Sequence, residues 1–182
     1  MSKIKLVALL GKSGSGKDTI LKTLPEDWHR VVPHTSRPKR ENEIHGKDYY
    51  FVTKDEMIDN PKILGKQLLN WYYGFHKDSF DPEAINVGVF NPGSLKLLEQ
   101  EGIFDILVFN IFAQDKTRLL RSLNREKNPN VKEIVRRYGT DEKDFSDLDN
   151  DFPYAIWLEN ENEEDLIDCS RIIEVQGRAH LG

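Results

Sequence analysis

The sequence predicts an α/β fold, a three-layer sandwich in which helices cover both faces of a five-stranded parallel β-sheet. Three features of the 182 residues support this prediction. Short apolar runs without alternation recur along the chain, as in strands that are buried on both faces. Segments with helix-capping signals separate these runs. The glycine-rich turn GKSGSGK joins the first apolar run to the first helical segment.

Five apolar segments are the predicted strands. The stretch from Lys3 to Leu10 forms the first, and ILVFNIF at 106–112 is the clearest of the others. In order along the chain, the predicted strands are 3–10, 30–33, 85–90, 106–112 and 154–158. Because parallel strands are joined by crossovers, we expect right-handed connections with helices between the strands.

The predicted helices lie between and after these strands. In order they are 17–24, 92–101, 115 to about 125, one that begins near 130, and 161–173. Pro25 ends the first, Gly102 follows the second, and Asp115 can cap the third. The stretch 35–57 is polar and punctuated by glycine and proline, with the pair Tyr49–Tyr50 leading into Phe51 and Val52.

Length, charge and cysteine content limit the function classes. A chain of 182 residues suits one compact domain, 1–182. The net charge of −5 gives the whole molecule no bias towards nucleic acids or anionic membranes. The lone Cys169 permits no internal disulfide, and the first apolar run is too short to span a membrane. We therefore expect a cytoplasmic protein without nucleic-acid or membrane partners.

The turn at 11–17 fits G-x-x-x-x-G-K, the motif of the phosphate-binding loop, or P-loop. Glycines let successive backbone N–H groups point at phosphate oxygens, and the following helix adds the positive end of its dipole. Lys17 supplies a compact charge for the β- and γ-phosphates. The predicted donor-nucleotide site is formed by Gly11, Ser13, Gly14, Ser15, Gly16 and Lys17.

Asp18 stands where this motif usually has a hydroxyl residue that binds Mg²⁺, and Thr19 follows it. An acid in the first turn of a helix also complements the helix dipole without any other role. A carboxylate is nevertheless a hard oxygen ligand that can hold Mg²⁺ directly or through a water. We therefore predict a Mg²⁺ ligand at Asp18, with Thr19 as the alternative.

A second cluster reads TSRPKRENEIHGKDYYFV at 35–52. Arg37 and Arg40 can each offer a forked pair of donors to a phosphate dianion, and the Tyr49 phenol can donate to the same group. Considered alone, the cluster fits an exposed basic loop equally well.

Together with WYYG at 71–74, these motifs resemble those of the guanylate kinases in order and spacing. The resemblance covers residue 6 to about residue 160. It implies a P-loop nucleoside monophosphate kinase that uses ATP and Mg²⁺. It also implies a core, a lobe for the nucleoside monophosphate (NMP) at about 34–84, and a helical lid at about 115–140. The compact length would suit a divergent, bacteriophage-type member.

Carried over residue by residue, the resemblance implies a set of residues that grip the phosphate of the acceptor. They are Arg37, Arg40, Tyr49 and Tyr73, with Glu43 orienting the arginines. In the lid it implies that Arg121 binds the donor nucleotide. The catalytic residues that it implies are Lys17, Arg37, Arg40, Arg125 and Arg137.

The spacing within 115–125 independently predicts an amphipathic lid helix. Three arginines at i, i+3 and i+7 share one face, and leucines occupy the other. These are Arg118, Arg121 and Arg125 against Leu119, Leu120 and Leu123. We expect the leucines to dock the helix and the arginines to face the ligand.

The sequence departs from the family at the positions that read guanine. Pro33 and Phe75 stand where the family has serines, and Leu64 stands where it has a glutamate. The strand at 86–93 lacks the carboxylates that the family carries there. Guanine's polar edge would be left unpaired, whereas Trp71, Tyr72 and Phe75 could stack on a base. The lost strand carboxylate motivates the hypothesis that its role in metal binding has moved to Asp18.

The predicted function is transfer of the γ-phosphate of Mg·ATP to an NMP or deoxy-NMP, with GMP or dGMP as the default acceptor. One alternative is a kinase for another dNMP or for a sugar phosphate such as ribose 1,5-bisphosphate, whose kinases share aspartate after the P-loop lysine. Another is a non-catalytic guanylate-kinase-like interaction module, but such modules usually lose the P-loop. We expect a monomer or a homodimer.

Overall fold

A five-stranded parallel sheet forms the centre of the molecule in this computed structural model, which describes residues 2–39, 43–68, 71–125 and 127–182. The strand order is β2-β7-β1-β8-β9. The strands are β1 (Ile4–Leu10), β2 (His29–Arg30), β7 (Asn86–Val89), β8 (Phe104–Phe112) and β9 (Ile156–Glu159). The prediction of an α/β fold with a five-stranded parallel sheet is confirmed, although β9 begins at Ile156 rather than at residue 154.

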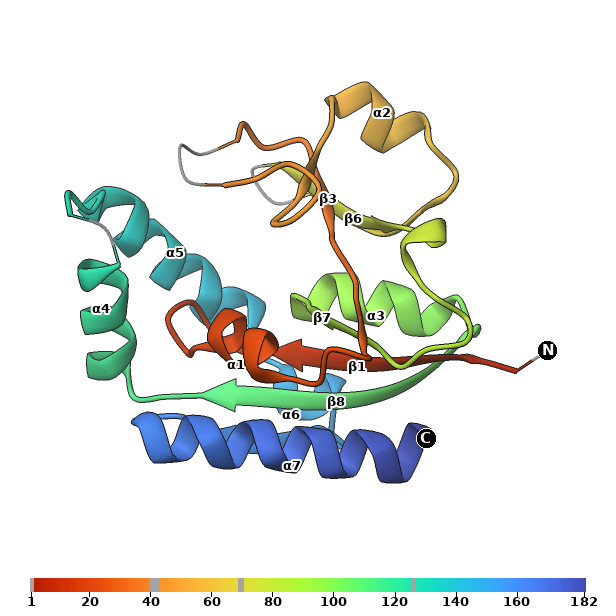
Figure 1. Cartoon of the computed structure of the whole chain (residues 1–182). Coiled ribbons are helices and arrows are strands. Elements are labelled where there is room, and N and C mark those ends of the chain that lie inside the picture. The colour runs from red at the N-terminus through yellow and green to blue at the C-terminus, as the bar shows by residue number, and fades with distance from the viewer. Residues whose placement is uncertain (1, 40–42, 69–70, 126) are drawn as a thin grey trace.

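Helices cover both faces of this sheet (Figure 1). On one face lie α3 (Pro92–Gln100), α5 (Val131–Asp144) and α6 (Leu148–Asp151), and on the other lie α1 (Lys17–Thr23) and α7 (Glu163–Leu181). Successive β1 residues alternate between the two apolar cores: Leu6 and Ala8 belong to one, and Val7 and Leu9 to the other. All four side chains are fully buried, so β1 is the central element of the sandwich.

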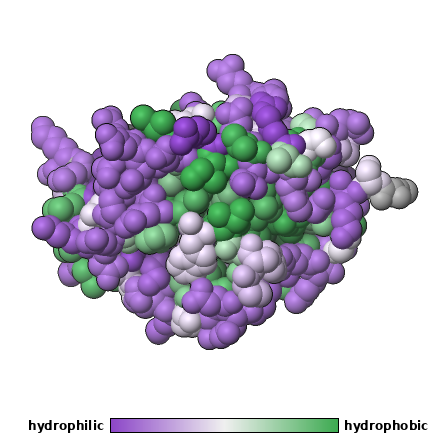
Figure 2. All heavy atoms as spheres, turned by 90° about the horizontal axis from the view of Figure 1, so that it is seen from below, coloured by the Kyte–Doolittle hydropathy of each residue, from purple (hydrophilic) through white to green (hydrophobic). Residues whose placement is uncertain are grey.

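The last helix, α7, is longer than its sequence suggests. Its second half is polar in sequence, but every fourth residue is buried. These buried residues are Cys169, Ile173, Gly177 and Leu181. Gly177 lets the helix pack closely on Trp28, because a Cβ there would lie 2.4 Å from the Trp28 ring. Figure 2 shows the face that carries α7, which is largely hydrophilic at its edges and has apolar side chains near its centre.

A smaller lobe lies above α3, on one side of the main sheet (Figure 1). It holds a four-stranded sheet in the order β4-β3-β6-β5. Its elements are β3 (His34–Thr35), β4 (Tyr50–Phe51), α2 (Lys54–Asp59), β5 (Ile63–Leu68), β6 (Tyr72–His76) and the 3₁₀ turn η1 (Lys77–Ser79). Two of these strands, β3 and β4, have only two residues each.

The remaining helix, α4 (Asp115–Asn124), follows β8 and leads into α5, which faces the small lobe (Figure 1). In parallel sheets, ligands bind beyond the carboxyl ends of the strands. That edge carries the P-loop after β1, α4 after β8 and the small lobe. Within the described ranges, none of the helices has the length and apolar character needed to cross a membrane.

Candidate functional site

The P-loop packs closely against the segments behind it, and its glycines make this possible. Gly11 has φ +145° and Gly16 has φ +96°, in the region that favours glycine. A Cβ at Gly11 would lie 2.2 Å from the Ile111 carbonyl oxygen, and one at Gly16 would lie 2.2 Å from Asn160 Nδ2. The loop therefore keeps its curled backbone only with glycine at both positions.

Lys17 opens α1 and lies against the P-loop backbone. Its Nζ donates hydrogen bonds to the carbonyl oxygens of Gly11 (2.6 Å) and Lys12 (3.1 Å). Burial lowers the pKa of Lys17 below its usual value, and the carboxylates of Asp18 and Asp141 oppose that shift. The ammonium group is thus held at the loop by neutral acceptors that a phosphate group can replace.

The predicted acceptor-phosphate residues form a cluster in the small lobe. Arg37 Nη2 donates to Glu43 Oε1 at 2.6 Å, and the guanidinium lies 5.3 Å from the Tyr49 ring centroid. Tyr73 meets Tyr49 edge to face, with 6.3 Å between ring centroids. Burial raises the pKa of Tyr49 to about 12, so its phenol remains a hydrogen-bond donor at neutral pH. Arg40, the other predicted member, lies outside the described residues.

A single cavity of about 440 Å³ joins these two groups. Its lining includes Gly11, Ser13 and Lys17 from the P-loop and Arg37, Tyr49 and Tyr73 from the small lobe. Helix α5 closes a further side of the cavity. The donor-phosphate and acceptor-phosphate sites predicted from sequence therefore open into one space.

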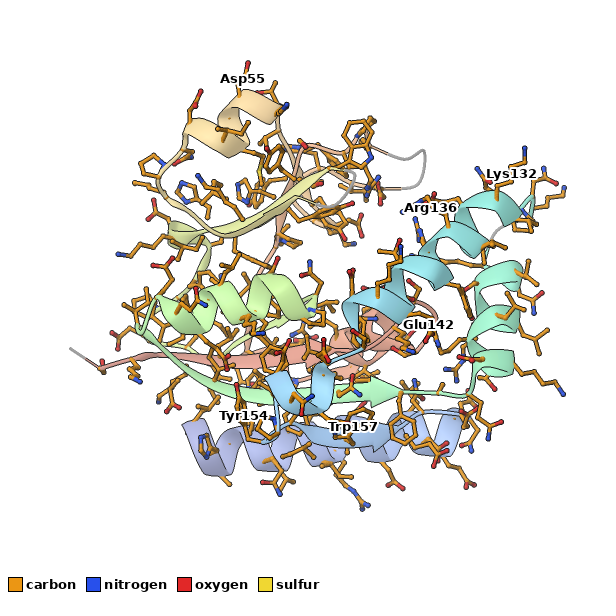
Figure 3. The ribbon with its side chains drawn as sticks, turned by 180° about the vertical axis from the view of Figure 1, so that it is seen from behind. Asp55, Lys132, Arg136, Glu142, Tyr154 and Trp157 are labelled. Atoms are coloured by element: carbon orange, nitrogen blue, oxygen red, sulfur yellow. The ribbon has the colours of Figure 1, made fainter. Side chains whose placement is uncertain are left out.

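Arg136 and Arg137 line the same cavity from α5. Both bind the Glu133 carboxylate, with Arg136 Nε–Oε2 at 2.8 Å and Arg137 Nε–Oε1 at 3.0 Å. Figure 3 shows Arg136 on the side of α5 that faces the small lobe, with Lys132 at the outer end of the helix. The family resemblance pointed to Arg137 and not to Arg136, the preceding residue, which lies about 100° around the helix axis from it.

Helix α4 is oriented differently from the sequence expectation. Among the described residues of this helix, only Arg118 is buried, whereas Leu119 and Leu120 are 40% and 48% exposed. The prediction that leucines dock the helix and arginines face the ligand is therefore wrong for these residues. The reason is that Arg118 finds enough partners to be buried as a charged group.

Arg118 connects α4 to the P-loop and to α5. Its guanidinium donates to the Ser13 carbonyl oxygen (3.0 Å), Asp115 Oδ1 (2.7 Å) and Asp141 Oδ2 (3.2 Å). It also lies 4.6 Å from the Tyr138 ring centroid. Arg118 is therefore a structural link behind the P-loop rather than a ligand-facing cation.

The other two α4 arginines are placed differently from each other. Arg121 Nη1 donates to the carbonyl oxygens of Asn160 (2.8 Å) and Gly14 (3.5 Å), beside the P-loop. Arg125 is exposed at the end of α4 and does not belong to the described residues that line the cavity. The structure thus brings Arg121, but not Arg125, to the donor side.

Two acids of α5 hold that helix on the P-loop, and sequence patterns gave no signal for them. Asp141 Oδ2 accepts from the Ser13 backbone N–H at 2.7 Å, so it binds one of the N–H groups that can face phosphate. Glu142 Oε1 accepts from Lys12 Nζ at 2.7 Å, and Figure 3 shows Glu142 near the inner end of α5.

The predicted Mg²⁺ ligands Asp18 and Thr19 are exposed in the first turn of α1. The Asp18 charge acts on both Lys17 and Tyr49, whose pKa values it raises, so it lies near both phosphate sites. Across the described ranges, no three His, Cys, Asp or Glu side chains come together as a ready-made metal site. A single carboxylate here fits a Mg²⁺ ion held chiefly by nucleotide phosphates.

The positions that replace the family's guanine readers carry apolar side chains in the structure as well. Pro33 and Phe75 line the cavity, whereas Leu64 is buried in the core above the sheet. On β7, Asn86 is fully buried, and its amide donates to the carbonyl oxygens of Lys5 and Asp81. Asn86 is thus part of the fold and not of the site.

Comparisons with known proteins were consistent with this geometry. The family model described as guanylate kinase matches residues 3–78. Guanylate kinase 2, chloroplastic/mitochondrial, from Oryza sativa subsp. japonica is 30% identical over 166 residues, which cover 83% of this chain and 56% of that protein. The guanylate kinase of Hyphomonas neptunium is 34% identical over 104 residues, covering 56% of this chain and 44% of the relative. The chain thus spans about half the length of these two relatives.

A solved structure supports the fold over nearly the whole chain. The crystal structure of guanylate kinase from Anaplasma phagocytophilum superposes with a TM-score of 0.62 at 20% sequence identity. The match covers 98% of this chain and 87% of that one. At this level of identity the likeness shows the fold alone.

Proposed function

We propose that the chain is an ATP-dependent nucleoside monophosphate kinase of the guanylate kinase family, and its similarity to guanylate kinases supports this proposal. One observation carries the proposal: the P-loop and the Arg37–Tyr49–Tyr73 cluster line the same cavity of about 440 Å³. A kinase needs the two phosphate groups side by side, because phosphoryl transfer depends on alignment and charge neutralisation.

In the proposed reaction, the P-loop amides and Lys17 bind the donor phosphates. Arg37, Tyr49 and Tyr73 bind the phosphate of the acceptor, and one oxygen of that phosphate attacks the γ-phosphorus of ATP. The bond between the γ-phosphorus and the bridging oxygen breaks, which yields ADP and a nucleoside diphosphate. Mg²⁺, when bound, would neutralise charge on the donor phosphates, and Asp18 is the residue of α1 that would hold it.

The arginines of α5 complete the site. Arg136 and Arg137 already line the cavity and are paired with Glu133, so they can move onto the transferring group as the site closes. Closure also excludes water, which would otherwise hydrolyse ATP. GMP and dGMP are the default acceptors because relatives carry the name guanylate kinase. We expect the protein to act in the cytoplasm as a monomer or a homodimer.

The test is ADP release with ATP, Mg²⁺ and each common NMP and dNMP. We expect turnover with at least one acceptor, and a loss of at least about 10²-fold in kcat for Lys17→Ala, because a charge that stabilises the transition state is removed. Lys22→Ala is the matched control, since Lys22 is an exposed lysine of the same helix. Equal activity of the two variants would refute the assignment of Lys17.

Arg40→Ala and Arg37→Ala should chiefly raise the KM for the acceptor and leave the KM for ATP near that of the wild type. Both arginines are assigned to the acceptor phosphate, and charged hydrogen bonds of this kind are among the strongest in proteins. A change confined to the KM for ATP would show that the small-lobe cluster binds the donor instead.

A further inference from the structure

An acidic side chain of α5 reaches into the donor end of the cavity. Asp141 lines the cavity together with Gly11, Ser13 and Lys17 of the P-loop. Its negative charge opposes the fall in the pKa of Lys17, as expected of a carboxylate that lies close to the ammonium group. In the proposed function this end holds the phosphates of ATP, so a carboxylate and a phosphate chain require the same space.

The groups that bind Asp141 are of the kinds that bind phosphate oxygens. Its Oδ2 accepts from the Ser13 backbone N–H at 2.7 Å and from Arg118 Nη2 at 3.2 Å. The Ser13 hydroxyl donates to Oδ1 at 3.3 Å. A backbone N–H of a glycine-rich loop, a hydroxyl and a guanidinium are common donors to phosphate. The Asp141 carboxylate therefore takes the place of a phosphate group at Ser13.

The next residue makes a second contact with the P-loop. Glu142 Oε1 accepts from Lys12 Nζ at 2.7 Å. This pair is open to solvent, whereas the Asp141 side chain is only 14% exposed, so the Asp141 contacts contribute more. Together the two acids fasten the inner end of α5 to two successive residues of the P-loop.

The same side of α5 carries cations farther out. Arg136 and Arg137 line the cavity, and Arg137 precedes Asp141 by four residues, which is about 6 Å along the helix axis. A phosphate chain in the P-loop would repel the Asp141 carboxylate and attract the two arginines. One side of α5 thus carries an anion that competes with phosphate and cations that bind it.

We propose that Asp141 is an autoinhibitory latch, which competes with the phosphates of ATP for the P-loop and holds α5 there until the nucleotide displaces it. The inference rests on the proposed kinase function, because it assigns a regulation to the same donor site. Displacement of Asp141 frees α5 to bring Arg136 and Arg137 to the transferring phosphate. Part of the binding free energy of ATP is used to break the latch, which lowers the apparent affinity.

The first experiment is calorimetric titration of the full chain with ATP and with inorganic tripolyphosphate. Asp141→Asn keeps the shape of the side chain and removes its charge, so the Kd for both ligands should fall about tenfold. Asp149→Asn removes the same charge from an exposed acid of α6 outside the cavity and should leave both Kd values unchanged.

Thermal unfolding without nucleotide separates a latch from simple repulsion between Asp141 and phosphate. A latch stabilises the protein in which it is closed, so Asp141→Asn should lower the Tm by about 2–4 °C while it tightens ATP binding. Repulsion without a latch would tighten binding with no loss in Tm, and that result would overturn the proposal.

The remaining outcomes also decide the question. An unchanged or higher Kd for ATP in Asp141→Asn would overturn the latch and leave the proposed function intact. A wild-type chain that does not bind ATP would overturn the proposed function, and the latch with it. If Asp141→Asn does not fold, Glu142→Gln replaces it, because Glu142 is exposed. A Kd for ATP lowered about two- to threefold in Glu142→Gln would support the latch, and an unchanged or higher Kd would overturn it.

Discussion

Asp18 shows how much a single residue can change within a familiar motif. It is exposed in the first turn of α1, next to Lys17, and its charge acts on both Lys17 and Tyr49. The carboxylate therefore lies near both phosphate sites and would repel a nucleotide unless a cation lay between them. A role of Asp18 in Mg²⁺ binding stays a prediction, beside the structural role of an acid that complements the helix dipole.

For Asp18→Ser, we expect activity to require a higher Mg²⁺ concentration, by about tenfold, because one carboxylate ligand is lost. The measurement is initial rate against free Mg²⁺ at saturating nucleotide. Glu26→Ser, at an exposed acid just beyond the same helix, controls for the change in charge. Full activity with an unchanged Mg²⁺ dependence would exclude the role in metal binding.

His34 gives a prediction about pH. Burial lowers its pKa to about 4, and the nearby His76 and His45 add to the shift. In the unfolded chain the pKa is about 6.5, so between pH 6.5 and pH 4 the unfolded state binds a proton that the folded state does not. Protonation of His34 therefore favours the unfolded chain, and the free energy of unfolding decreases as the pH falls from 6.5 towards 4. Because His34 is only partly buried, solvent screening limits this loss to about 1 kcal/mol at pH 5.

Urea unfolding at pH 7.5 and pH 5 measures this effect. His34→Gln should show a smaller loss of unfolding free energy between the two pH values than the wild type does. A loss of equal size in both proteins would show that His34 is not the group responsible.

Sequence predicted the residues whose chemistry is carried by a local motif. Lys17 and the P-loop follow from seven consecutive residues, and Arg37 with Tyr49 follows from one segment. Arg136 and Asp141 were not predicted, because their roles depend on where α5 lies relative to the P-loop. No spacing rule encodes that placement.

At the scale of elements, α4 shows why helical periodicity can mislead. A stripe of leucines usually marks the buried face of a helix. Here α4 contacts the P-loop and the polar face of α5, so the arginine face is the one that packs. The partners of Arg118 are a backbone carbonyl and two carboxylates, which together compensate for its burial.

Two substitutions on α4 test this orientation by thermal or urea unfolding. Arg118→Ala should lower the unfolding free energy by about 3–5 kcal/mol, because it leaves the half-buried Asp141 without its cation. Leu120→Ala should change it by no more than about 0.5 kcal/mol, because Leu120 is 48% exposed. A larger loss of unfolding free energy for Leu120→Ala than for Arg118→Ala would show that the leucine face is the one that packs, as the sequence predicts.

The two remaining errors at this scale have physical causes of their own. The second half of α7 was not predicted, because its sequence is mostly polar and includes Gly177. The buried residues there pack against segments far away in the sequence, such as Trp28. The small sheet was missed because β3 and β4 have two residues each and pair with strands far along the chain. Local patterns do not contain such pairings.

For the whole molecule, the arrangement of two parts around one cavity explains the proposed activity. The parallel sheet positions the P-loop, and the small lobe positions Arg37, Tyr49 and Tyr73 on the other side of the same space. The sequence predicted the main sheet because its strands are apolar and regularly separated by helices. It predicted the lobe only through family resemblance.

The most direct measurement follows the γ-phosphate itself. The chain is incubated with γ-³²P-labelled ATP, Mg²⁺ and a mixture of the common nucleoside monophosphates, and the products are separated. We predict that label appears in a nucleoside diphosphate, at a rate lowered at least about 10²-fold by Lys17→Ala. Label released only as inorganic phosphate, or label that stays in ATP, would contradict the claim that the cavity unites donor and acceptor phosphates.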